Sequence, residues 1–206
     1  MSRRKKKPAY NPRKDARDFV KAMMQSVLKK QAVFIESTEF LSGRIDRERE
    51  VTEAITHEEL KAFTLKALDE AQAAFLGMCQ QGKELFGKLI VEADAKAVPV
   101  FDMLNDNSKT WKEIKDQFHV DHTELSLIDQ RANMLAMDIQ GTSIEIFSTY
   151  NAKVKFVKQA LNNGHTVEQA EVLLAEALAN NSKELPKNAI VDHNDVVVET
   201  EEAANV

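Results

Sequence analysis

Two histidines, His119 and His122, lie three residues apart in a segment that also holds Asp116 and Asp121. This is the closest approach to a metal site that the residue pattern offers. Zinc takes three or four convergent ligands, and no further His or Cys cluster is adjacent. The other histidines are scattered along the chain. We therefore interpret the segment as a polar turn between helices and predict neither a metal nor any other cofactor.

Nucleophilic catalysis has no support in the residue pattern. The chain holds no Gly-rich phosphate loop and no Ser in a strand–turn–helix context. Cys79 is the only cysteine, which excludes an intrachain disulfide and a Cys-based metal cage. Phe75 and Met78 share its helical face, so we predict a buried thiol that packs as a small hydrophobic group. We predict a protein that is not an enzyme and that works in a reducing compartment, the cytoplasm.

Residues 111–128 could form a helix-turn-helix unit, in which two short helices pack through regularly spaced apolar residues. Lys115 stands where a small residue usually lets the helices touch, and His119 stands where Gly usually makes the turn. Glu124 and Asp129 would face the DNA, where a reader of the major groove needs Arg, Asn or Gln. Two interpretations stay open, a DNA-reading unit or an ordinary helical corner, and the acidic residues favour the corner. The apolar positions concerned are Ile114, Phe118, Val120, Leu125 and Ile128.

The first 14 residues carry seven positive charges and no acid, although the whole chain has a net charge of −5. Such a cluster can neutralise several phosphates. No apolar pattern or lipidation signal accompanies it, and the longest apolar runs fall far short of the roughly 20 residues that span a membrane. We therefore predict nucleic acid rather than a membrane as its partner. The candidate phosphate contacts are Arg3, Arg4, Lys5, Lys6, Lys7, Arg13 and Lys14.

The residues that must position these charges are overwhelmingly helix formers, interrupted by only 6 Gly and 4 Pro. From residue 15 onward, apolar residues recur in heptads that predict a long helix with a hydrophobic seam. This seam either packs against residues 57–94 of the same chain or pairs with a second copy, and the two interpretations are not exclusive. The candidate self-association residues are Val20, Met24, Val27, Gln31, Phe34 and Leu41.

A second long helix is expected after Thr56, which with Glu59 forms a capping box. Its inner face contains Ala and Gly, including Gly82, and such small residues let another backbone come close. The favoured core is an antiparallel helical hairpin over residues 15–104. Pro99 is expected to end or kink its second arm.

Shorter helices are predicted over residues 108–182, because four further pairs have capping-box spacing. Gly141 is expected to stop one of these helices, and Asn163–Gly164 is expected to form a C-cap. The pairs are Thr110 with Glu113, Asp121 with Glu124, Thr142 with Glu145, and Thr166 with Gln169.

The sequence thus predicts an all-α protein with four parts: a disordered basic tail (1–14), a long helical hairpin (15–104), a bundle of shorter helices (108–182) and a disordered acidic tail (183–206). The favoured function is a non-enzymatic homo-oligomer that contacts nucleic acid through its basic arm, in a regulatory, packaging or architectural role. Two alternatives are an assembly or scaffold protein, for example of a virus particle, and an adaptor or inhibitor that binds a protein partner.

Overall fold

The computed structural model describes residues 10–180, which form four α-helices and the links between them. The helices are α1 (Pro12–Glu53), α2 (Glu58–Asn105), α3 (Trp111–Asn162) and α4 (Val167–Asn180). No residue in this range forms a β-strand, so the all-α prediction is confirmed. Residues 3–7 and the predicted acidic tail, 183–206, lie outside the described residues. None of the helices over 10–180 is both long and apolar enough to cross a membrane.

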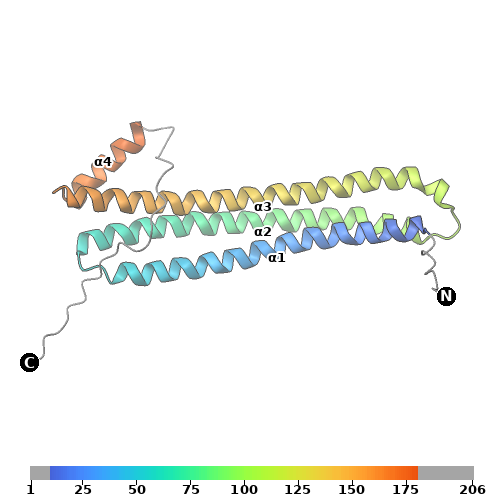
Figure 1. The fold of residues 1–206 in the computed structure, drawn as a ribbon, viewed down its shortest axis with the longest axis horizontal. Helices are drawn as coiled ribbons and strands as arrows, with labels where there is room; N and C mark the ends of the chain where they lie inside the picture. The colour runs from blue at the N-terminus through green and yellow to red at the C-terminus, as the bar shows by residue number, and fades with distance from the viewer. Residues whose placement is uncertain (1–9, 181–206) are drawn as a thin grey trace, which may run out of the picture. The chain divides into compact units, whose positions relative to one another are not determined.

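The chain divides into two compact units after Phe147, at a point inside α3. The first unit contains α1, α2 and the greater part of α3. These helices lie side by side, and α1 turns back into α2 through residues 54–57 (Figure 1). The second unit contains the last turns of α3 and the whole of α4.

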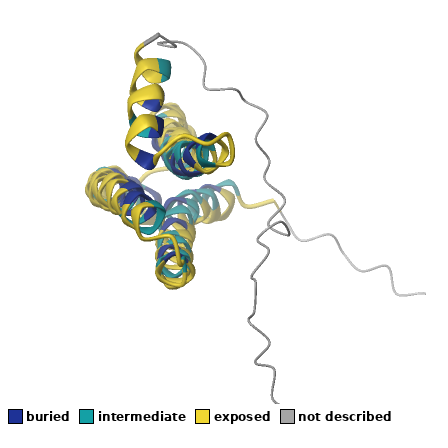
Figure 2. Cartoon of the chain, turned by 90° about the vertical axis from the view of Figure 1, so that its left-hand side faces the viewer, coloured by how far each residue is buried: buried dark blue, intermediate teal, exposed yellow. Residues whose placement is uncertain are grey.

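The core of the first unit forms where α1, α2 and α3 meet. One apolar cluster surrounds Val20, Val100 and Phe118, and a second surrounds Phe34, Phe86 and Ile128. Each cluster draws residues from all three helices. Buried positions therefore run along the inner sides of the long helices, and exposed positions run along their outer sides (Figure 2). Burial of these apolar side chains is the main favourable term that holds the unit together.

The start of α1 follows the pattern expected from its sequence. Pro12 occupies the first helical position, where its missing N–H costs no hydrogen bond. The Asn11 side chain accepts a hydrogen bond from the backbone N–H of Lys14 at 3.1 Å. The last three residues of the predicted basic tail, 12–14, thus form the first turn of a helix. The start of α2 is shifted by one residue from the prediction, because His57 rather than Thr56 is its N-cap.

The prediction of several short helices after residue 108 is wrong, because α3 runs unbroken from Trp111 to Asn162. Asp121 does not cap a new helix but accepts a hydrogen bond from Gln117 at 2.9 Å. Thr142 donates its hydroxyl to the carbonyl of Asp138, one turn earlier in the same helix. Gly141 lies within α3 and does not stop it. Since residues 111–128 contain no turn, a helix-turn-helix unit is excluded for this segment.

Close packing accounts for one glycine of α2. A Cβ atom on Gly82 would lie 2.7 Å from Phe34 of α1 and 2.9 Å from Ile139 of α3, so only glycine lets both side chains approach. By contrast, no atom lies within 4 Å of a Cβ built on Gly77 or Gly87. Pro99 lies inside α2 and does not end it, since the helix continues to Asn105.

The second unit joins the end of α3 to α4 through a tight link. Gly164 has a positive φ of 84°, and the N–H of His165 donates to the carbonyl of Ala160 at 3.1 Å. This is the Schellman arrangement, which confirms the predicted C-cap. The predicted capping box that starts α4 is also confirmed. Thr166 and Gln169 exchange two hydrogen bonds, of 3.0 and 3.2 Å.

Candidate interaction surfaces

The side chain of Arg13 fastens the start of α1 to the link between α2 and α3. Its Nη1 donates to the carbonyl of Leu104 at 3.2 Å and to that of Asp106 at 2.8 Å. Its Nη2 donates to the carbonyl of Lys109. A guanidinium can bridge several acceptors at once because its donors form a rigid planar fork. Arg13, one of the predicted phosphate contacts, therefore has a structural role. Lys14 is the other predicted contact that the structure describes, and it is exposed.

The same link is stabilised from within by two acidic side chains. Asp106 accepts hydrogen bonds from the N–H and the hydroxyl of Ser108, and these bonds lower the pKa of its carboxyl. Glu113 accepts from the backbone N–H and the hydroxyl of Thr110, which lowers its pKa as well. The bond from the Thr110 N–H is one of the two bonds of the capping box predicted for this helix; the hydroxyl of Thr110 donates to Glu113 instead of accepting from its N–H. The corner from which the N-terminal arm departs is therefore a locally ordered structure.

The predicted self-association seam of α1 is used inside the chain. Val20, Val27 and Phe34 are buried against α2 and α3, and Met24 packs against both core clusters. Gln31 and Leu41 are half-buried. Side chains that already fill the core of one chain cannot also fill the core of a dimer. These residues are therefore not available to pair with a second copy while the core of the first unit is intact.

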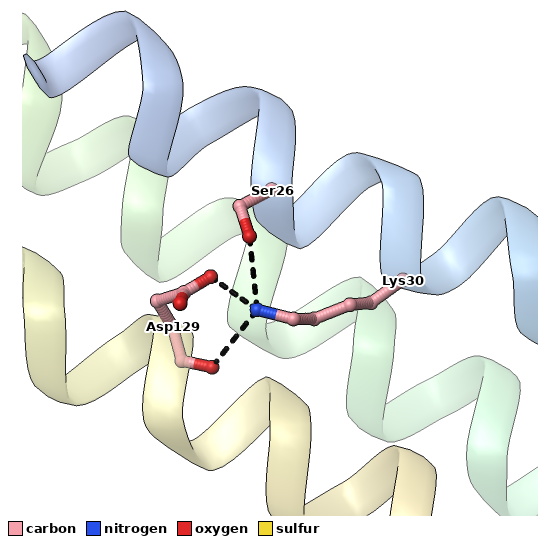
Figure 3. Close-up of polar contacts among 3 residues, drawn as sticks. All are labelled: Ser26, Lys30 and Asp129. Carbon is pink, nitrogen blue, oxygen red and sulfur yellow. Dashed lines mark hydrogen bonds and ion pairs between the residues drawn. The ribbon is translucent and has the colours of Figure 1, made fainter.

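Charged residues between the helices occupy the borders of the core. The Lys30 ammonium of α1 contacts the Asp129 carboxylate of α3. Both side chains are largely shielded from water, with exposed fractions of 17% and 18%. The Ser26 hydroxyl lies 3.0 Å from the same ammonium (Figure 3). Two further ion pairs, which are more exposed, join α2 to α3: Lys96 with Glu124 at 2.7 Å, and Arg131 with Glu92 at 2.5 Å.

The outer face of α3, opposite the core, carries a second apolar stripe that the sequence analysis did not identify. We define this outer face as Val120, Leu127, Met134 and Met137, whose exposed fractions are 55, 52, 63 and 71%. Residues 120, 127 and 134 are seven apart, and Met137 lies one turn beyond Met134. A heptad spacing therefore runs along both sides of α3. The signal is present in the sequence, but only the fold reveals which stripe faces the core.

Most charged side chains along the outer face are engaged within the first unit. Residues 117–137 contain four charged side chains. Three of them form the ion pairs with α1 and α2 described above, and Asp121 accepts a hydrogen bond from the amide of Gln117. Uncharged polar residues such as Thr123 and Gln130 are exposed along the same stretch. Exposed Met beside few unpaired charges is a feature of the centre of protein–protein interfaces.

The histidine and cysteine side chains considered as metal ligands or nucleophiles pack against other residues of the fold. His122 stacks on Phe19 with ring centroids 3.9 Å apart, and it meets the edge of Phe118 at 5.9 Å. No group of three or more His, Cys, Asp or Glu side chains that could hold a metal occurs over residues 10–180. Cys79 is buried, as predicted, and burial raises the pKa of its thiol.

Comparison with known proteins gives no match to the chain, whether among family models, curated proteins or solved structures.

Proposed function

We propose that this chain is a non-enzymatic, self-associating helical protein that contacts nucleic acid through its basic N-terminal arm, in a regulatory, packaging or architectural role. The observation that carries the proposal is the charge at the start of the sequence, where Arg3, Arg4, Lys5, Lys6 and Lys7 follow one another without an acid. Phosphate neutralisation by such residues supplies most of the affinity in non-specific binding.

The fold supports this proposal by fixing the root of the arm. Because Arg13 donates to three carbonyls of the α2–α3 link, the first turn of α1 is held at that corner. Lys14 and Lys109 are exposed there and add positive charge beside the root. An arm that starts from a fixed corner presents its charges to the same partner that contacts Lys14 and Lys109. We expect Lys14 to contribute to binding and Arg13 to contribute to stability.

The direct test measures binding to a mixed-sequence DNA duplex by fluorescence anisotropy, at a series of salt concentrations. Replacement of residues 3–7 by Gln removes five positive charges. The slope of log affinity against log salt should then fall by about 4 to 5, since each neutralised phosphate contributes about 0.9. The matched control replaces five exposed helical lysines by Gln, at positions 21, 29, 83, 88 and 155. Equal losses in both variants, or unchanged binding by the arm variant, would contradict the proposal.

An assembly or scaffold-type role, for example in a virus particle, is the second candidate, and the outer face of α3 favours it. Monomeric proteins rarely leave a continuous apolar stripe exposed without a use for it. In this case the chain should form oligomers after nuclease treatment and without any nucleic acid present. An adaptor or inhibitor role would instead give a stable complex with one basic protein, in keeping with the excess of acids over bases in residues 108–140.

A further inference from the structure

We propose that the outer face of α3 binds the same face of a second copy of this chain, with the two α3 helices antiparallel. The inference deepens the self-association part of the proposed function and depends on it. It does not depend on nucleic acid. The surface is the stripe formed by Val120, Leu127, Met134 and Met137, together with the uncharged polar residues beside it.

The length of the stripe suits helix pairing. From Val120 the exposed apolar residues continue to Met137, and Ile144 lies on the same side one heptad further on, 63% exposed. The distance from residue 120 to residue 144 is about three and a half heptads, and three to four heptads are typical of a coiled-coil pair. Side chains with such large exposed fractions gain free energy when a second apolar stripe covers them.

The charge of the surface favours an identical copy over a charged partner. The chain carries a net charge of −5, so two copies repel each other over most of their surface. Over residues 117–137, three of the four charged side chains of α3 form ion pairs within their own chain, and Asp121 alone is held by a neutral amide. Two copies can therefore approach through this face with few uncompensated like charges. A strongly charged partner, by contrast, would find little opposite charge on it.

The two ends of the stripe differ in charge, and this difference sets the orientation. Lys112, Glu113, Lys115 and Asp116 are all exposed at its start and balance in charge, whereas its far end carries Asp138 and Glu145 and no base. An antiparallel pair brings the acidic end of one copy towards the balanced end of the other. A parallel pair would place the two acidic ends together, which is unfavourable. Opposed helix dipoles also favour the antiparallel arrangement.

The test compares two double variants by sedimentation velocity of nuclease-treated protein over a range of concentrations. Leu127→Glu with Met134→Glu places charges in the centre of the outer face. Val91→Glu with Val98→Glu makes the same change, at the same seven-residue spacing, on exposed positions of α2. We expect the α3 variant to dimerise at least about 100-fold more weakly than the wild type, because truncated or charged central residues dominate interface energetics. The α2 variant should dimerise as the wild type does.

Circular dichroism checks that both variants keep their helices, which Glu favours at exposed positions. If the Glu variant loses helicity, Leu127→Gln with Met134→Gln repeats the test without added charge and should also weaken dimerisation. Dimers that persist in the folded α3 variants would overturn this surface while leaving self-association intact. A wild-type chain that stays monomeric at every concentration would overturn both the surface and the self-association part of the proposed function. Neither result would alter the DNA-binding test, which reports on the arm alone.

Discussion

The seam of α1 and the outer stripe of α3 have the same heptad spacing but opposite environments. Val20 of the α1 seam is fully buried, whereas Leu127 of α3 is 52% exposed. Only the first has two long helices to cover it. The comparison teaches that heptad periodicity identifies a face that packs, but not the partner against which it packs. It also separates the two faces of α3 itself, one of which is buried in the core while the other is exposed.

The largest expected effect comes from two adjacent residues of α3. Ile128 is 2% exposed in the core, and its neighbour Leu127 lies on the outer face. Ile128→Glu buries an unpaired charge and should cost at least about 4 kcal/mol of unfolding free energy. Leu127→Glu should change the stability of the monomer by less than about 0.5 kcal/mol. Urea unfolding at low protein concentration measures both, and similar losses in the two variants would remove the distinction between the faces.

Two glycines sharpen the contrast between packed and open surfaces. Gly82→Ala should destabilise the chain by about 1–3 kcal/mol, because the new methyl group overlaps Phe34 and Ile139 in a packed core. Phe34 cannot retreat easily, since its ring packs on Phe86 with centroids 5.4 Å apart. Gly141→Ala, which meets no atom within 4 Å, should stabilise α3 by up to about 1 kcal/mol. Thermal unfolding distinguishes the two, and a tolerated Gly82→Ala would show that the interior is more loosely packed than the distances indicate.

The ion pairs of α3 extend the comparison to charged residues. Asp129→Asn leaves the Lys30 ammonium half-buried without its carboxylate, which should cost about 1–3 kcal/mol. Arg131→Gln breaks the exposed pair with Glu92 and should cost less than about 1 kcal/mol. Chemical denaturation at low and high salt checks the difference, since salt screens only the exposed pair strongly. The opposite order of the two losses would place Lys30 and Asp129 in solvent.

The smallest expected effect concerns the capping box that starts α3. The backbone N–H of Thr110 holds the pKa of Glu113 below its ordinary value. A lowered pKa in the folded state gives stability that is complete above the unfolded pKa and is lost as the pH falls through the folded pKa. Glu113→Gln can still accept this hydrogen bond but does not titrate. The stability difference between wild type and variant should therefore shrink as the pH falls below about 4, the usual range for Glu. A difference that stays constant with pH would contradict the role of the ionised carboxylate.

Local features of the fold could be predicted from the sequence. The capping box at Thr166 and the C-cap at Gly164 depend on residues three to five positions apart, and they occur as expected, while the box at Thr110 forms one of its two bonds. The buried positions Val20, Val27 and Phe34 also followed from periodicity. Such patterns are reliable because the interactions that produce them lie within one or two helical turns.

Features that depend on packing could not be predicted. Asp121 and Thr142 have the spacing of N-caps, yet Leu125, Ile128 and Ala132 continue the buried stripe of α3, and burial of that stripe outweighs the local signals for a break. Val120, predicted as one of the apolar packing positions of residues 111–128, is instead 55% exposed. The sequence offered two heptad stripes on α3, and only the positions of α1 and α2 decide which one becomes the core.

The distance between identical spin labels on two paired chains distinguishes antiparallel from parallel pairing of α3. Two separate variants, Gln130→Cys and Gln140→Cys, each place one spin label at an exposed position of α3. The chain without either substitution is the background control, because its only thiol, Cys79, is buried. An antiparallel pair centred near residue 130 predicts a short distance at Gln130 and, at 1.5 Å per residue, a distance at Gln140 that is longer by up to about 30 Å. Equal distances at the two positions, or no dipolar coupling at either one in a self-associated sample, would contradict antiparallel pairing through the outer face of α3.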